Sequence, residues 1–473
     1  MKKARFLALL LALCLACGLL AACKGNDPPP AEPPAGPPVS PQPEKPAGIT
    51  EGSFTYYELE DGTWAVIAAD AVIEGALSIP ATFRDKSVTQ IGLQHPTERD
   101  VYYGFAGKNE LTAITIPASV KTILPYAFTA CKGLRTVTLA EGAQLSSIGS
   151  YALAECTALT ELALPEGLTT LGDAALSACT TLQSVTLPST LTTLGSRVFE
   201  DCHKLLYVTN LSAVTLTGLS EFAEVRTSTD TAFAATVTEN NGIEILSING
   251  KQYLFGYVGT EAVLDLTALG FTAVFPAALM GNKTVTEIKL PEALTEIGYY
   301  AFFECSSLTK LSFGESSQLT TIGDAAFEAC RALSNLTLPG DLESIGYRAF
   351  VGCEALAELA IPASVTEIGD TAFAACILLA KLTFAEESRL ATIGSQAFFA
   401  CEKLSEVSLP ASLTHIGDRA FVGCAALSAV AFGSRTGWQL TPGPEGGAPS
   451  LSNTANNAYY LTDLYANCTW SRA

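Results

Sequence analysis

The chain has 473 residues, of which 48% are hydrophobic, and its formal net charge is -20. A chain this acidic is not expected to bind nucleic acid, because the phosphate backbone is bound by clustered Lys and Arg. The same charge disfavours electrostatic docking on an anionic membrane surface.

The N-terminus has the features of an export signal. Three basic residues among the first five precede an apolar run from 6 to 20, which is too short for a stable transmembrane helix. The run ends in Leu20-Ala21-Ala22-Cys23, which resembles the lipobox of bacterial lipoproteins. The resemblance implies that residues 1–22 are a lipoprotein signal peptide and that Cys23 is the lipidated residue. An ordinary secretory peptide cleaved nearby is the alternative.

Residues 23–50 are expected to form a disordered tether, because prolines crowd the stretch from 28 to 46. Such a sequence cannot build a core and favours polyproline II, which extends about 3.1 Å per residue. A lipidated Cys23, a tether over 23–50 and a folded domain after it together predict an exported protein that is lipid-anchored to a bacterial membrane and faces outward.

A repeat of 23 or 25 residues follows a predicted β-rich N-terminal cap over 51–104. Ten cysteines mark it, each with Phe or Leu three residues before and Leu three residues after. A fixed period of this length is typical of a solenoid, in which each short unit buries its apolar face against the next. The marking cysteines are Cys131, Cys156, Cys179, Cys202, Cys305, Cys330, Cys353, Cys376, Cys401 and Cys424.

One unit illustrates the expected local structure. Leu162 and Leu164 alternate as in a strand, and Pro165 ends it because proline cannot donate to a ladder. The recurring Gly172 implies either an unusual backbone angle or a close approach, and Asp173 is suited to capping a short helical turn. We therefore predict an α/β-type repeat solenoid, a stack of short strands and short helical turns.

The repeats fall into two blocks. The first block, 105–210, has five units, and the second, 276–432, has seven. Between them, a β-rich insert is expected over 211–275, where two apolar runs flank a hairpin signal at Asn249-Gly250. Residues 433–473 are expected to form a C-terminal cap or tail.

The repeated pattern Leu-x-x-Leu-x-Leu-Pro-x-x-Leu-Thr-x-Ile-Gly-x-x-Ala-Phe-x-x-Cys resembles the BspA-type bacterial leucine-rich repeat. The resemblance covers roughly 72–210 and 276–432, and the tail from Tyr459 to Arg472 resembles a piece common on such proteins. It implies a surface-exposed bacterial protein, and some members are adhesins that bind host matrix proteins or other bacteria. The family pattern is structural, so it implies no catalytic residue.

Neither an enzymatic site nor a bound cofactor or metal is expected. The chain has only three histidines, His95, His203 and His415, each expected at the surface, and common catalytic motifs are missing. Single cysteines in a line do not converge on a metal as zinc ligands do. Buried thiols are the favoured interpretation of the cysteine column, and disulfides between adjacent units are the alternative.

Two groups of residues are candidates for contact with a protein or glycan partner. The first is the aromatic set of the insert, Tyr253, Phe255 and Tyr257, since aromatic side chains are frequent binding anchors. The second is an exposed charged column in the second block, formed by Glu287, Lys310, Glu358, Lys381 and Glu406. The predicted function is a non-enzymatic interaction or adhesion module, with a structural envelope or cell-wall scaffold that has no host ligand as the alternative.

Overall fold

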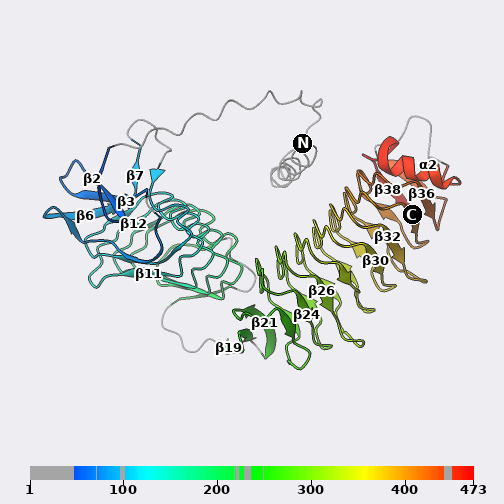
Figure 1. The fold of residues 1–473 in the computed structure, drawn as a ribbon, viewed down its shortest axis with the longest axis horizontal. Helices are drawn as coiled ribbons and strands as arrows, with labels where there is room; N and C mark the ends of the chain where they lie inside the picture. Colours follow the sequence, from blue (N-terminus) through cyan, green and yellow to red (C-terminus); the bar gives the residue numbers. More distant parts are fainter. Residues whose placement is uncertain are drawn as a thin grey trace. The chain divides into compact units, whose positions relative to one another are not determined.

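The structure is a computed structural model, and it describes residues 47–70, 72–95, 102–217, 219, 223–227, 236–248, 250–441 and 450–472 (Figure 1). The predicted signal peptide, Cys23 and nearly all of the predicted tether lie outside the described residues. Residues 48–473 form one compact unit.

Each repeat contributes one short strand to a parallel ladder that runs along the stack. Its first part starts within the predicted cap and continues through the first block, comprising β6 (Lys86–Ile91), β10 (Thr122–Ile123), β12 (Ser147–Ile148), β14 (Thr170–Leu171) and β16 (Thr193–Leu194). In the second block it comprises β23 (Ala273–Val274), β25 (Glu296–Ile297), β27 (Thr321–Ile322), β29 (Ser344–Ile345), β31 (Glu367–Ile368), β33 (Thr392–Ile393) and β35 (His415–Ile416).

A second strand from each repeat lies on another side of the stack and forms shorter parallel sheets. One sheet joins β4 (Gly75–Ser78) of the predicted cap to β9 (Leu111–Ile116) and β11 (Thr136–Leu139) of the first block. The next joins β13 (Glu161–Ala163), β15 (Ser184–Leu187) and β17 (Tyr207–Asn210) of that block to β18 (Glu224–Arg226) of the predicted insert. In the second block, where Figure 1 shows the strands stacked one behind another, they are β22 (Val263–Asp265), β24 (Glu287–Lys289), β26 (Lys310–Ser312), β28 (Asn335–Leu336), β30 (Glu358–Ile361), β32 (Lys381–Phe384), β34 (Glu406–Leu409) and β36 (Ala429–Phe432).

The third side of each rung is a turn, not the short helical turn that the sequence predicted. Its amides alternate between local and inter-rung acceptors: the Ala175 amide donates to Gly172, whereas the Leu176 amide donates to Val198 of the next rung. Two residues per turn, such as Ala174 and Ala178, also have positive φ, which a helix excludes. The α/β part of the predicted fold class is therefore wrong, and the fold is a β-solenoid of leucine-rich repeats.

Helix is confined, among the described residues, to the C-terminal region. Helix α2 (Thr454–Tyr459) begins after Asn453, whose side chain accepts from the amides of Ala455 and Asn456. The π-helical segment η2 (Tyr460–Leu464) follows it directly.

Phenylalanine and cysteine form two files through the core, as the repeat predicts. In the second block the Phe rings stack nearly parallel, at 5.1 Å between Phe350 and Phe373. Each cysteine is buried and free, and its thiol donates to a carbonyl of the preceding rung, as Cys353 does to Phe327 at 3.3 Å. Apolar burial and a weak hydrogen bond therefore both tie one rung to the next.

The recurring glycine is required by close approach. Gly369 does not have a positive φ, and a Cβ built on it would lie 2.7 Å from the carbonyl carbon of Gly346. The residue after the glycine does not cap a helix but bridges rungs: Asp370 Oδ1 accepts from the Ser395 amide at 2.6 Å. The predicted capping role is therefore wrong, because the acceptor serves the neighbouring rung.

Each block begins with an antiparallel meander whose last strand joins the parallel ladder. Strands β1 (Ile49–Glu51), β2 (Phe54–Glu58) and β3 (Trp64–Ala68) precede the first block, and β3 pairs in parallel with β6. Strands β19 (Thr236–Asn240), β20 (Ile243–Ile248) and β21 (Lys251–Tyr257) precede the second, and β21 pairs in parallel with β23. The predicted hairpin is confirmed as β20–β21. Small antiparallel pairs add β5 (Thr82–Phe83) to β6 and join β7 (Leu93–Gln94) to β8 (Tyr102–Tyr103).

The last rung is covered by an antiparallel cap. Strand β38 (Thr469–Arg472) pairs with β35 and with β37 (Trp438–Thr441). Trp470 is 1% exposed and its ring lies 5.9 Å from that of Phe432. The cap therefore seals an otherwise open sheet edge, which would invite pairing with another chain.

Candidate partner-binding surface

The predicted charged column lies on the shorter sheets of the second block, and most of its charges are paired along the stack. Lys310 Nζ lies 2.8 Å from Glu287 Oε1, and Lys381 Nζ lies 3.4 Å from Glu358 Oε2. Glu406 is exposed and lies opposite Ala429 in the pairing of β34 with β36. Exposed ion pairs of this kind contribute about 0–1 kcal/mol each.

A further ion pair lies in the neighbouring column of the same sheet, where Asp265 on β22 is opposite Lys289 on β24. Lys289 Nζ lies 3.0 Å from Asp265 Oδ2. Hydrogen bonds from the Thr267 hydroxyl and from Lys289 lower the pKa of Asp265 to about 2. The same carboxylate raises the pKa of Lys289. The pair therefore stays ionised at neutral pH and places fixed charges of both signs beside the column.

The three aromatic candidates of the insert differ in exposure. Phe255 is fully buried, so its predicted contact with a partner is wrong: its ring packs inside a small core with Leu206, Leu246 and Phe275. Tyr257 is partly exposed, and its hydroxyl accepts from the Glu261 amide at 2.7 Å.

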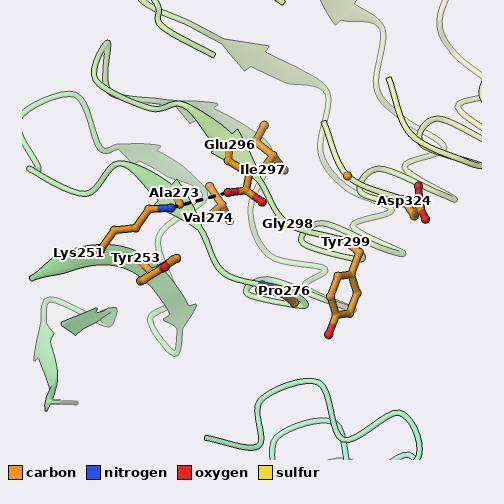
Figure 2. A pocket seen from close by; sticks show the side chains of 11 residues that line it. Lys251, Tyr253, Ala273, Val274, Pro276, Glu296, Ile297, Gly298, Tyr299 and Asp324 are labelled. Atoms are coloured by element: carbon orange, nitrogen blue, oxygen red, sulfur yellow. Dashed lines mark ion pairs between the residues drawn. The ribbon is translucent and has the colours of Figure 1, made fainter. Parts of the chain in front are cut away.

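Tyr253 is partly exposed and lines a cleft on the first rungs of the second block (Figure 2). The cleft has a volume of about 490 Å³. Lys251 and Tyr253 on β21 form one side, and Tyr299 and Asp324, each directly after a rung glycine, form the other. The remaining lining residues are Ala273, Val274, Pro276, Glu296, Ile297, Gly298 and Gly323.

The charged groups of the cleft have defined partners. Lys251 Nζ lies 3.7 Å from Glu296 Oε2 and 5.1 Å from the centre of the Tyr253 ring. Asp324 Oδ1 accepts from the Tyr347 amide at 2.8 Å. The lining therefore combines one cation, two carboxylates and two phenol rings.

A second hollow adjoins this cleft and shares Lys251 with it. Its volume is also about 490 Å³, and its lining is small or uncharged apart from that lysine. The lining residues are Ser247, Gly250, Lys251, Gln252, Gly270 and Thr272. Lys251 of the β20–β21 hairpin therefore lines both hollows.

Sequence reasoning missed most of this site. Only Tyr253 was a candidate. Lys251 comes from the insert and Glu296, Tyr299 and Asp324 come from different rungs, so their spacing in the sequence does not show that the four lie together. One signal was present: Tyr299-Tyr300 follows Gly298, the first rung glycine of the second block, whereas every other unit except that of Tyr347 has Asp or Ser directly after its glycine.

The start of the second block also contacts the end of the first. His203 was expected at the surface, but it is only 8% exposed, and its ring lies 5.1 Å from that of Tyr300. Lys204 is buried beside it, with Nζ 4.9 Å from the centre of the Phe255 ring. Burial lowers the pKa of His203, and it lowers the pKa of Lys204 to about 8 against the opposing effect of Glu244.

Burial makes the thiols of the core cysteines harder to deprotonate. Burial raises the pKa of the Cys131 thiol to about 11. It likewise raises the pKa of Cys156, Cys179, Cys202, Cys305, Cys330, Cys353, Cys376 and Cys401. In the described part of the chain, no group of three or more His, Cys, Asp or Glu could hold a metal ion. Within the same residues, no helix has the length and apolar character needed to cross a membrane.

Comparisons with known proteins agree with the repeat pattern. The model of the BspA type leucine rich repeat region matches six copies, over residues 101–228, 275–389 and 381–437. A search of curated proteins gives no significant match.

Three similar solved structures are leucine-rich repeat proteins of bacteria. One from Bacteroides ovatus is 23% identical, covers 77% of this chain and 95% of its own, and has a TM-score of 0.30. One from Eubacterium ventriosum is 18% identical, with coverages of 85% and 98% and a TM-score of 0.44. A leucine rich cell surface protein from Faecalibacterium prausnitzii is 19% identical, with coverages of 83% and 96% and a TM-score of 0.32. The family match spans more than half of the chain, so the protein belongs to the BspA-type leucine-rich repeat family.

Proposed function

We propose that the protein is a non-enzymatic bacterial lipoprotein, displayed at the cell surface, that acts as a protein-interaction or adhesion module. The observation that carries the proposal is the repeat architecture. The side chains common to all units lie inside the stack, so those that vary form continuous outer faces, and solenoids use such extended surfaces for binding.

Lipid attachment at Cys23 is the anchoring part of this proposal. Its support is the lipobox-like sequence before Cys23 and the proline-rich stretch after it. In cells fed an alkyne-tagged fatty acid, the wild-type protein should become labelled and should fractionate with membranes. Cys23→Ala should abolish the label, whereas Cys17→Ala, in the same leader, should retain it. Undiminished labelling of Cys23→Ala would refute the anchor.

The partner is proposed to be a protein or glycan on host matrix or on other bacteria, and not nucleic acid. Full-length protein should bind saturably to immobilised matrix proteins or to bacterial cells. Lys381→Glu reverses the cation beside Glu358 and should weaken binding if the charged column contacts the partner. Lys283→Glu, an exposed lysine outside the column, is the matched control.

A structural envelope scaffold without a host ligand is the alternative. The pairing of charges within the column favours it, since ion pairs already satisfied along the stack offer less to a partner. Binding of the full-length protein to purified peptidoglycan, together with no binding to matrix proteins or intact bacteria, would select this alternative.

A further inference from the structure

We propose that the cleft between Tyr253 and Tyr299 binds an uncharged oligosaccharide. The inference rests on the proposed interaction function and names the ligand class that this part of the surface recognises. Four features of the cleft carry it: its aromatic sides, its polar rim, its charge and its closed strand edges.

The aromatic sides suit a sugar ring. Tyr253 and Tyr299 lie on opposite sides of the cleft and are both partly exposed (Figure 2). A tyrosine offers an apolar ring and a polar hydroxyl, and a sugar has the matching combination of C–H faces and a rim of hydroxyls. A volume of about 490 Å³ lies within the range of small-molecule sites.

The polar groups both donate and accept hydrogen bonds. Lys251 donates, Glu296 and Asp324 accept, and the phenol hydroxyls do both. Sugar hydroxyls also donate and accept, so each can satisfy either kind of group. The adjoining hollow continues this pattern with Ser247, Gln252 and Thr272, which fits a ligand longer than one sugar ring.

The charge of the cleft disfavours an anionic polymer. The Lys251 ammonium is already 3.7 Å from the Glu296 carboxylate, and Asp324 adds a second negative charge to the lining. The whole chain carries a net charge of -20. An acidic polysaccharide would therefore be repelled, whereas an uncharged one would not.

The strands of the cleft offer no free edge for an extended peptide. Strand β21 is paired with β20 on one side and with β23 on the other, and β23 is paired in turn with β25. Peptides that add a strand to a sheet need an unpaired edge for main-chain hydrogen bonds. The cleft therefore favours recognition through side chains, as in sugar binding.

The repeat supplies a matched control for the test. Tyr299 follows Gly298, and Tyr347 occupies the same repeat position after Gly346. Only Tyr299 lines the cleft, although Tyr347 is 43% exposed. Replacing either with alanine removes the same side chain from the same backbone environment.

Titration calorimetry of the full-length protein with cellotetraose, maltotetraose, chitotetraose and mannotetraose tests the proposal. At least one should bind with a Kd below about 1 mM, and Tyr299→Ala should weaken that binding about tenfold or more. Tyr347→Ala should leave it unchanged. Asp324→Asn keeps the acceptor for the Tyr347 amide and should also weaken binding, which covers the case in which Tyr299→Ala does not fold.

Two results would overturn the saccharide assignment: no binding of any of the four, or equal binding by wild type, Tyr299→Ala and Asp324→Asn. If no saccharide binds but wild type and Tyr299→Ala capture matrix proteins or bacteria equally, the saccharide assignment is overturned. The proposed interaction function is then unaffected. Failure of both assays would refute both proposals.

Discussion

The rung glycine offers the sharpest test of how the repeats stack. Gly369 lies in the middle of the second block, and the three atoms nearest to a Cβ there are all backbone: the carbonyl carbon of Gly346 at 2.7 Å, its oxygen at 2.8 Å and the amide nitrogen of Tyr347 at 2.8 Å. Backbone atoms cannot rotate away as a flexible side chain can. Gly369→Ala should therefore force two rungs apart.

The size of the effect follows from the distances. Ordinary contact begins at 3.4 Å, so the rungs must separate by about 0.7 Å (3.4 - 2.7). The Gly369 amide donates to the Ile345 carbonyl at 2.8 Å, and this shift would lengthen the bond to about 3.5 Å, beyond the normal range. Losing one hydrogen bond costs about 1 kcal/mol, and overpacking costs about 1–3 kcal/mol. We expect the free energy of unfolding to fall by about 3 kcal/mol.

Urea and thermal unfolding followed by circular dichroism measure this change. Gly340→Ala is the control, since Gly340 lies in the same block, has an ordinary φ and has nothing within 4 Å of its Cβ position. It should be neutral or stabilising by up to about 1 kcal/mol, because alanine restricts the unfolded chain. Equal unfolding midpoints for Gly369→Ala and Gly340→Ala would refute the argument that close approach selects glycine.

Three further predictions follow from burial. Among the described cysteines, only Cys468, the one that is not buried, should react with a thiol reagent at pH 8; rapid labelling of Cys376, mapped by mass spectrometry, would contradict the buried file. Lys204 has a folded-state pKa of about 8 against 10.5 unfolded, so the unfolded state binds more protons between these values and stability should rise from pH 8 to 10.5. Lys204→Met should accordingly raise Tm at pH 7, where the exposed control Lys283→Met should not, and the gain should fade by pH 10; a lower Tm would contradict a net burial penalty. Trp470→Ala should cost about 3–5 kcal/mol and expose the sheet edge at β35, giving larger species in light scattering; a particle size equal to that of the wild type would argue against the capping role.

The core and the order of the units could be predicted from the sequence. In a stack of repeats, each residue packs against the equivalent residue of the next unit. The repeat pattern therefore predicts that Phe350 stacks on Phe373 and that Cys353 is buried against the preceding rung, where its thiol donates to the Phe327 carbonyl. The first unit of each block has a polar residue in place of cysteine, Lys108 or Asn282, and both are partly exposed. These features depend only on the stacking of similar units, in which each unit contacts only its two neighbours.

The turn could not be assigned correctly in this way, and for the glycine the sequence left a backbone angle and a close approach as alternatives, of which the structure shows the close approach. Asp173 before a run ending in Cys179 resembles a capped helical turn, but in the stack the Asp173 carboxylate accepts from Ser196 of the next rung at 2.7 Å. Hydrogen bonds to a neighbouring rung compete with those within a helix, and sequence periodicity does not distinguish the two.

The amino-acid sequence alone determined the period, the two blocks, the buried files and the hairpin of the insert, because each of these depends on residues close in the chain or on copies of one unit. Only the tertiary structure decided that the turns are not helical, that His203 and Phe255 are buried, and that Lys251, Tyr253, Tyr299 and Asp324 share a cleft. That cleft forms where a unique hairpin meets the first rungs of a block. Contacts between unlike segments follow no repeat, so no pattern in the sequence specifies them.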